Sequence, residues 1–277
     1  MAHIEHRPPF RRTVGVLAAA VLWLAMQFSS AARAAPLNFP RATFEVLNAA
    51  QTEVIGRSDF ALSQRSDGLL IGHGEAHFKD GESDTEYDTL RPVPGSQSAE
   101  MLTLERWFYN ADGSPQRHST ADFRTGQAAC TEYVKGKADT KSATLKFPAG
   151  SYAGSAIILP LQEYLAGGGT GPIELHAFNC VPGPRVFAVK AEPKPPGAWL
   201  RYPGQTVEVD IKPDFGFLNF IVAPFLPELH AWFEPSKDWL FVGGQFSRYY
   251  KGQQIVLVRE RTSAHADAQM PSPVAQK

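Results

Sequence analysis

"TVEVDI", residues 206–211, is the stretch that decides the fold class of this chain. Apolar residues occupy its odd-numbered positions and polar residues occupy its even-numbered positions. Successive side chains of a β-strand point to opposite faces of a sheet, so this period of two predicts a strand with one buried and one polar face. Such a half-buried strand is typical of an antiparallel sheet.

Strand-like segments of the same kind recur along the chain and are separated by turn signals. Ser66-Asp67-Gly68 marks a hairpin between two of them, and "NADGSP" at 110–115 marks another. One segment, "SAIILPLQEYLAGGG" at 155–169, predicts a helix with Pro160 in an early turn and Gly167 at its end. The sequence therefore predicts an all-β fold, a mainly antiparallel sheet curled into an open barrel or a sandwich, with one short helix. The expected strands lie at 59–64, 69–78, 85–90, 100–109, 116–123, 130–134, 173–181, 185–191, 206–211, 228–234, 239–244 and 253–260.

The N-terminus has the pattern of a cleaved export signal. A basic opening precedes a short apolar run, and an A-x-A site ending at Ala34 places the cut before Ala35. A membrane anchor is the alternative, but the apolar run is shorter than the roughly 20 residues that span a bilayer. Residues 1–34 are therefore expected to be a signal peptide, with the mature chain in the periplasm or secreted. Arg11 and Arg12 leave both general and twin-arginine export open.

The mature chain is expected to form a single β-barrel-like domain over residues 35–262. A proline-rich connector, "AEPKPPGAWLRYPGQ" at 191–205, is expected to be a long surface loop of that domain, with a boundary between two domains as the alternative. The apolar segment 214–233 contains prolines that exclude a membrane-spanning helix, and we expect it in the core, with contact to a lipid surface as the alternative. The tail at 263–277 is expected to be disordered.

The charges and the cysteines limit the possible partners. Positive and negative charges nearly cancel, with a formal net charge of −1, and neither sign is clustered. This balance argues against a nucleic-acid-binding surface.

The two cysteines are Cys130 and Cys180. Export to an oxidising compartment favours a disulfide between them, and two buried free thiols are the alternative.

"IGHGEAHF", residues 71–78, carries His73, Glu75 and His77 on one face of an expected strand. Two imidazoles and a carboxylate are a set of ligands that zinc accepts. However, neighbouring side chains on one face of a strand stand about 6.5–7 Å apart, so the three would not reach one ion without a kink. Since the opposite face is small and apolar, we expect it to pack inside and these three residues to face solvent. A metal site at His73 and His77 is the alternative.

Aromatic residues gather on several expected strands. Trp107 and Tyr109 share one strand, Trp232 and Trp239 lie farther along the chain, and Arg248 precedes two tyrosines. Antiparallel barrels that hold a ligand line their mouths with aromatic side chains and a few polar groups. These five residues are therefore candidate ligand-binding residues, and an aromatic core with cross-strand pairs is the alternative.

The segment "HAWFEPSKDWLFVGGQFSRYYKGQQIVLVRE", residues 230–260, carries a resemblance to a known group. Trp232-Phe233, Asp238, Arg248 and Gly252 follow the order of a Trp-Phe strand, an acidic turn, a basic strand and a Gly-led final strand. In this order the chain resembles uncharacterised periplasmic proteins of Gram-negative bacteria built as open, lipocalin-like β-barrels. The resemblance implies a barrel-like fold and a periplasmic location, and it transfers no catalytic residue.

Together these features favour an exported envelope protein that is not an enzyme. We expect it to bind a hydrophobic or amphipathic small molecule, or to aid envelope maintenance, without a cofactor and without spanning the membrane once the signal is removed. One alternative is a metal-dependent hydrolase that uses His73, Glu75 and His77. The other is a structural or protein-interaction module whose aromatic second half docks on a partner. The sequence contains no G-x-S-x-G, phosphate-loop or C-x-x-C motif.

Overall fold

The computed structural model describes residues 41–96, 98–180, 182–214, 229–248 and 252–260. Sixteen strands in this part of the chain join one sheet, which is mainly antiparallel and does not close on itself. The predicted all-β fold class is therefore confirmed, and so is the short helix.

The elements are β1 (Ala42–Asn48), β2 (Val54–Gln64), β3 (Leu70–Phe78), β4 (Ser83–Pro92), β5 (Ala99–Tyr109), β6 (Pro115–Asp122), β7 (Gln127–Val134), β8 (Lys137–Thr144), β9 (Ser151–Tyr152), the 3-10 helix η1 (Gly154–Ile157), the α-helix α2 (Ile158–Ala166), β10 (Ile173–Cys180), β11 (Pro184–Pro193), β12 (Gly197–Trp199), β13 (Tyr202–Asp214), β14 (Leu229–Glu234), the 3-10 helix η4 (Pro235–Lys237), β15 (Leu240–Ser247) and β16 (Gln254–Arg259).

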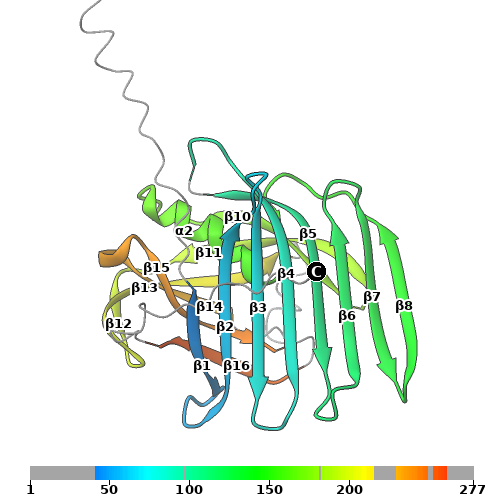
Figure 1. The fold of residues 1–277 in the computed structure, drawn as a ribbon. Coiled ribbons are helices and arrows are strands. Elements are labelled where there is room, and N and C mark those ends of the chain that lie inside the picture. Colours follow the sequence, from blue (N-terminus) through cyan, green and yellow to red (C-terminus); the bar gives the residue numbers. More distant parts are fainter. Residues whose placement is uncertain (1–40, 97, 181, 215–228, 249–251, 261–277) are drawn as a thin grey trace, which may run out of the picture. The chain divides into compact units, whose positions relative to one another are not determined.

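The order of the strands in the sheet follows the chain over most of its width (Figure 1). From β8 to β1 each strand pairs with the one before it, and β16 then continues the sheet from β1 into β15, β14 and β13. Beyond β13 the sheet runs through β11 and β10 and ends at β9, which is parallel to β10. Because β16 pairs with β1, strands from both sides of the proline-rich connector belong to one sheet.

The connector at 191–205 differs from the long surface loop expected there. It includes β12, which folds back as a hairpin and pairs with the start of β13. Trp199 on β12 is buried and stacks on Trp232 of β14, with the ring centroids 4.3 Å apart, while Leu200 in the turn is exposed. The prolines interrupt the sheet only briefly, because burial of the Trp199 ring favours the return of the chain onto it.

Helix α2 begins and ends for reasons that the sequence contains. Pro160 lies in its first turn, as predicted, where a missing N–H costs no intrahelical hydrogen bond. Gly167 occupies the C-cap, and Gly168 after it adopts a left-handed φ of 82° that suits a residue without a Cβ. The N–H of Gly168 donates to the carbonyl of Leu165 at 3.0 Å and so closes the last turn.

The core surrounds this helix. Leu161 and Leu165 of α2 pack in one cluster with strands β1, β10, β11 and β13 to β15, which includes Phe233. Leu159, from the other side of the helix, packs in a second cluster with strands β3 to β7, which includes Leu104. The side of the sheet that contributes to these two clusters is called the inner face below, and the opposite side the outer face. The helix therefore fills the space that the curled sheet encloses.

The predicted disulfide is confirmed. Cys130 on β7 and Cys180 on β10 are bonded, with their Cα atoms 5.7 Å apart. The link joins the inner face of β7 to a strand that is far from it in the order of the sheet. It therefore holds the two parts of the curled sheet together across the second core cluster.

Several predictions concern segments outside the described residues. These are the signal peptide at 1–34, the tail at 263–277 and the part of the apolar segment at 215–228. The apolar segment continues into β14, where Trp232 and Phe233 are buried, as the core interpretation predicts. No helix in the described part of the chain has the length and apolar character needed to cross a membrane.

Candidate functional site

The "HGEAH" strand, β3, has the two faces that the sequence predicts. Leu70, Ala76 and Phe78 are buried on its inner face. His77, on the outer face, is exposed, and its Nε2 atom lies 2.7 Å from Oε1 of Glu75. The imidazoles and the carboxylate thus lie on the polar side of the strand.

Cross-strand register places further side chains beside them on the outer face. His73 lies opposite Tyr87 on β4, and Tyr87 lies opposite Glu105 on β5. The rings of His73 and Tyr87 stack with centroids 4.6 Å apart. Glu105 in turn lies opposite Thr120 on β6. These four side chains therefore form a row on the outer face that crosses the four strands from β3 to β6.

A second group on this face is aromatic and centres on Trp107. Its ring stacks on His118 of β6 with centroids 3.6 Å apart, and on Tyr109 with centroids 6.1 Å apart. Glu105 accepts a hydrogen bond from Nε1 of Trp107 at 2.9 Å and lies 3.2 Å from Nε2 of His118. We call Trp107, Tyr109 and His118 the outer aromatic stack. Glu105 fixes its orientation through two polar contacts.

An open hollow of about 730 Å³ lies beside the stack, across β4 to β8. Glu105 belongs to its lining and contacts Trp107 and His118, so this carboxylate connects the hollow to the stack. Hydroxyl groups dominate its polar side chains, and the bond from Arg124 lowers the pKa of Asp122 to about 2, which keeps that carboxylate ionised. The lining includes Tyr87, Thr89, Thr103, Glu105, Thr120, Asp122, Gln127, Ser142 and Thr144.

The structure brings together only two of the five residues predicted to bind a ligand. Trp107 and Tyr109 lie on the outer face of β5. Trp232 is buried against Trp199, and Trp239 packs against the first core cluster. Arg248 is also buried, with its guanidinium 3.4 Å from the centroid of the Phe78 ring. Trp232, Trp239 and Arg248 therefore belong to packing contacts away from the outer aromatic stack.

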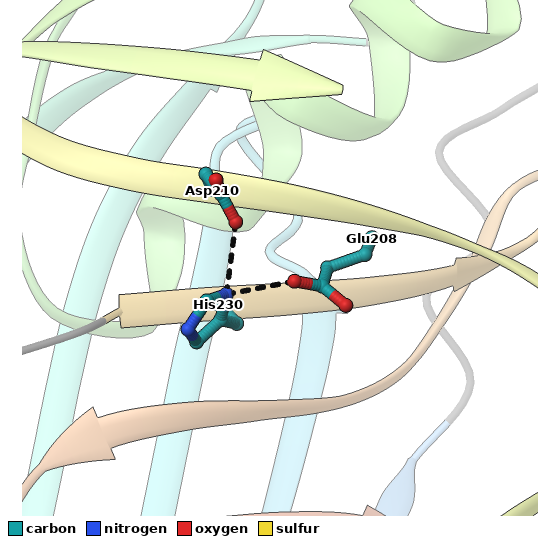
Figure 2. A group of neighbouring side chains, drawn as sticks. All are labelled: Glu208, Asp210 and His230. Atoms are coloured by element: carbon teal, nitrogen blue, oxygen red, sulfur yellow. Dashed lines mark hydrogen bonds and ion pairs between the residues drawn. The ribbon is translucent and has the colours of Figure 1, made fainter. Parts of the chain in front are cut away.

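A cluster of three metal-ligand types lies on the outer face of β13 and β14 (Figure 2). Nδ1 of His230 is 3.0 Å from Oε1 of Glu208 and 3.0 Å from Oδ1 of Asp210. The alternation in "TVEVDI" places Glu208 and Asp210 on one face, but the sequence gives no sign of His230. Its position opposite Asp210 depends on the pairing register of β13 with β14.

Three acidic residues, Asp84, Glu86 and Asp88, lie on the inner face of β4, where no sequence pattern predicts them. Arg106 on β5 contacts Asp84 and Glu86, in both cases at 3.3 Å. Glu86 accepts hydrogen bonds from the backbone N–H of Ser155 at 2.7 Å and from its hydroxyl at 2.5 Å. Glu86 therefore anchors the start of the helical segment, where unpaired N–H groups favour a negative charge. We therefore assign these acidic residues a structural role and do not include them in the candidate ligand site.

The outer face of β3 to β8 thus combines aromatic rings with hydroxyl and carboxylate groups. Rings bind flat apolar surfaces, and the polar groups orient a ligand through hydrogen bonds. The cluster on β13 and β14 is separate from this face and has the chemistry of a metal site. No protein-family model matches the chain, and a search of curated proteins found no match, so function has to be inferred from these side chains.

Proposed function

We propose that the chain is an exported protein of the bacterial envelope that binds an amphipathic small molecule and is not an enzyme. The observation that carries this proposal is Glu105, which lines the open hollow and also contacts Trp107 and His118 of the outer aromatic stack. One ligand could place a flat apolar surface on Trp107 and direct its polar edge into the hollow. Ligand sites commonly combine aromatic walls with a few oriented polar groups.

The chemistry of the lining favours a polyhydroxylated ligand, such as a saccharide, over a purely hydrophobic one. Thr103, Thr120 and Ser142 offer hydroxyl groups that both donate and accept hydrogen bonds, and Asp122 accepts them. A hydrocarbon ligand would cover these groups without replacing their hydrogen bonds to water, which costs free energy. A sugar ring meets both demands, because its hydroxyl edge pairs with the lining and its C–H face stacks on a ring.

Two observations support export. The Cys130–Cys180 disulfide suits an oxidising compartment, and the N-terminus has the sequence pattern of a signal peptide. The resemblance to lipocalin-like periplasmic proteins agrees with this location and with an open curled sheet. We therefore place the mature protein in the periplasm or outside the cell.

The contacts on β3 favour binding over hydrolysis. Glu75 is hydrogen-bonded to His77, whereas the His73 ring stacks on Tyr87. The two imidazoles thus have separate partners, and His77 and Glu75 are held together without His73. Polar and aromatic groups arranged in this way can contact a ligand, but they do not converge on one reacting atom as a catalytic zinc site requires.

Titration of the mature protein with a panel of soluble ligands tests the proposal. The panel consists of neutral oligosaccharides, octyl glucoside and a fatty acid, and binding is followed by calorimetry and by NMR of the tryptophan indoles. We expect an oligosaccharide or the glycoside to bind and to shift the Trp107 signal. Trp107→Ala should weaken binding by about two- to tenfold, as loss of a stacking contact would.

Matched variants separate the site from the rest of the surface. Thr120→Val removes a hydroxyl with little change in shape and should also weaken binding. Leu200→Ala changes an exposed residue in the β12–β13 turn and should leave binding unchanged. If the wild type, Trp107→Ala and Thr120→Val bind the ligand with equal affinity, the ligand binds at another site. Binding of the fatty acid alone would contradict the polyhydroxylated class.

A further inference from the structure

We propose that Glu208, Asp210 and His230 bind one divalent transition-metal ion, of which zinc is the representative. We call these three residues the acid–histidine site. They lie on the outer face of β13 and β14, and no other group of three such side chains within the described ranges has ligand atoms within 4.8 Å of one another. The site lies on other strands than the hollow, so this proposal does not depend on the proposed function.

The two strands hold the three side chains on one face. Val209, between the two acids, is fully buried on the inner face, which fixes Glu208 and Asp210 on the outer face. Asp210 pairs directly with His230 in the β13–β14 ladder, and Glu208 pairs with Trp232. The inner face of β14 is likewise fixed by Phe233, which is fully buried. The β13–β14 ladder is regular across these positions, so the placement follows from packing of the inner face.

The distances between the ligand atoms suit a metal ion. One oxygen of each carboxylate lies 3.0 Å from the same nitrogen, Nδ1 of His230 (Figure 2). Zinc binds nitrogen and oxygen at about 2.0–2.2 Å, so tetrahedral ligands lie about 3.3–3.6 Å apart. The observed separations need only a small expansion to admit an ion. A proton on Nδ1 can point to one carboxylate oxygen, whereas an ion at this point would contact both.

The second oxygen of each carboxylate is held by another group. Oε2 of Glu208 accepts a hydrogen bond from Nε1 of Trp232 at 3.2 Å. Oδ2 of Asp210 lies 2.9 Å from Nζ of Lys194. These contacts direct the remaining oxygens, Oε1 and Oδ1, towards His230. Carboxylates that bind metals are commonly oriented by outer partners of this kind.

Charge and ligand type select the kind of ion. Lys194 and Lys212 both lie within 4.0 Å of Asp210 and offset the two negative charges. Calcium and magnesium depend on several oxygen ligands, and this site offers few. The imidazole nitrogen favours zinc, copper or nickel instead.

Solvent can reach the site from one side. The Asp210 side chain is 12% exposed and that of Glu208 is 38% exposed. An ion could therefore enter past Glu208 and keep a water molecule as a fourth ligand. Three protein ligands with a water molecule in the fourth position are a coordination that zinc adopts in proteins.

Calorimetric titration of the chelator-treated mature protein with zinc chloride tests the proposal. We expect one zinc ion per chain, and excess magnesium should not displace it. His230→Ala, Asp210→Asn and Glu208→Gln should each weaken zinc binding at least tenfold. Circular dichroism of each variant checks its fold, and Glu208→Gln, at the most exposed ligand, preserves side-chain size. Cobalt bound in place of zinc should give a visible absorption spectrum that His230→Ala abolishes.

Two control variants make the assignment specific. His77→Ala removes the imidazole of the rival group on β3, and His176→Ala removes one on β10. Both should retain one zinc ion with wild-type affinity. Loss of zinc in His77→Ala with retention in His230→Ala would overturn the proposal and assign the ion to β3. Absence of saturable zinc binding in the wild type, or binding unchanged in folded Glu208→Gln and Asp210→Asn, would also overturn it.

Discussion

Asp88 lies on the inner face of β4, opposite Gly72 of β3, and its side chain is almost fully buried. Neither carboxylate oxygen has a partner at hydrogen-bonding geometry among the described residues. Burial, followed by the neighbouring charge of Glu86, raises the pKa of Asp88 well above its ordinary value. The folded protein therefore holds a proton on this residue at pH values where the unfolded chain has released it.

Replacement of Asp88 by Asn should raise the free energy of unfolding at neutral pH. Between the unfolded pKa, about 3.9, and the raised folded pKa, the native state binds more protons, so wild-type stability falls as pH rises. Asn carries no charge and avoids this loss. We expect a gain of about 1–3 kcal/mol at pH 7 that shrinks towards pH 4. Urea unfolding at both pH values checks this, and a gain independent of pH would contradict it.

The two outer-face histidines of β3 should differ in their effect on stability. His77 is largely exposed, so His77→Ala should change the free energy of unfolding by less than about 0.5 kcal/mol. His73→Ala removes the ring that stacks on Tyr87 and should cost up to about 1 kcal/mol. Urea midpoints of the two variants provide the comparison. A larger loss in His77→Ala than in His73→Ala would show that the stack contributes little.

Residue patterns predicted the faces of β3 but not those of β4. In β3 one face is small and apolar, so hydrophobicity alone identifies the inner side. In β4 the inner positions carry Asp84, Glu86 and Asp88, and the outer positions carry Thr85 and Tyr87. Both faces are polar. On the inner face, Asp84 and Glu86 contact Arg106, and Glu86 also contacts the start of the helical segment, which the sequence does not place there.

Among the elements, β8 is a strand that hydrophobic alternation in the sequence does not predict. Its sequence, "KADTKSAT", is polar on both faces, and nearly every position is exposed. The strand forms one end of the sheet, so neither hydrophobic alternation nor burial marks it. Lys137 and Lys141 lie on this edge, and charged side chains of this kind discourage pairing with another chain. The Asp-Gly hairpins, in contrast, were predictable because their turns require particular residues.

Reduction of the Cys130–Cys180 disulfide should lower the free energy of unfolding by about 3–4 kcal/mol. The bond closes a long loop, with a sequence separation of 50, and so restricts the unfolded chain. It also ties β7 to β10 across the core. Urea unfolding with and without a reducing agent measures the effect, and the Cys130→Ala, Cys180→Ala double variant should not respond to the reductant. An unchanged midpoint in reduced wild-type protein would contradict this.

At the scale of the whole molecule, the pairing of β1 with β16 is the feature that sequence analysis could not supply. It joins Val46 to Leu257, two residues near opposite ends of the described chain. The pattern of "QQIVLVRE" indicates a strand but not its neighbour, since many partners would bury the same apolar face. The pairing is supported by the first core cluster, which contains Phe44 of β1 together with Val209 and Phe233 from the second part of the chain.

A chain that ends at Lys190 should therefore be insoluble or molten, whereas one that ends at Thr262 should fold like the full mature chain. The shorter chain lacks β12 to β16, so Phe44 loses its packing against Phe241, and β1 and β11 become unpaired edges. Exposed apolar edges of this kind favour aggregation. Gel filtration and thermal unfolding of both chains measure the difference. Cooperative melting of a soluble monomer ending at Lys190 would show instead that β1 to β11 form an independent domain and that the connector is its boundary.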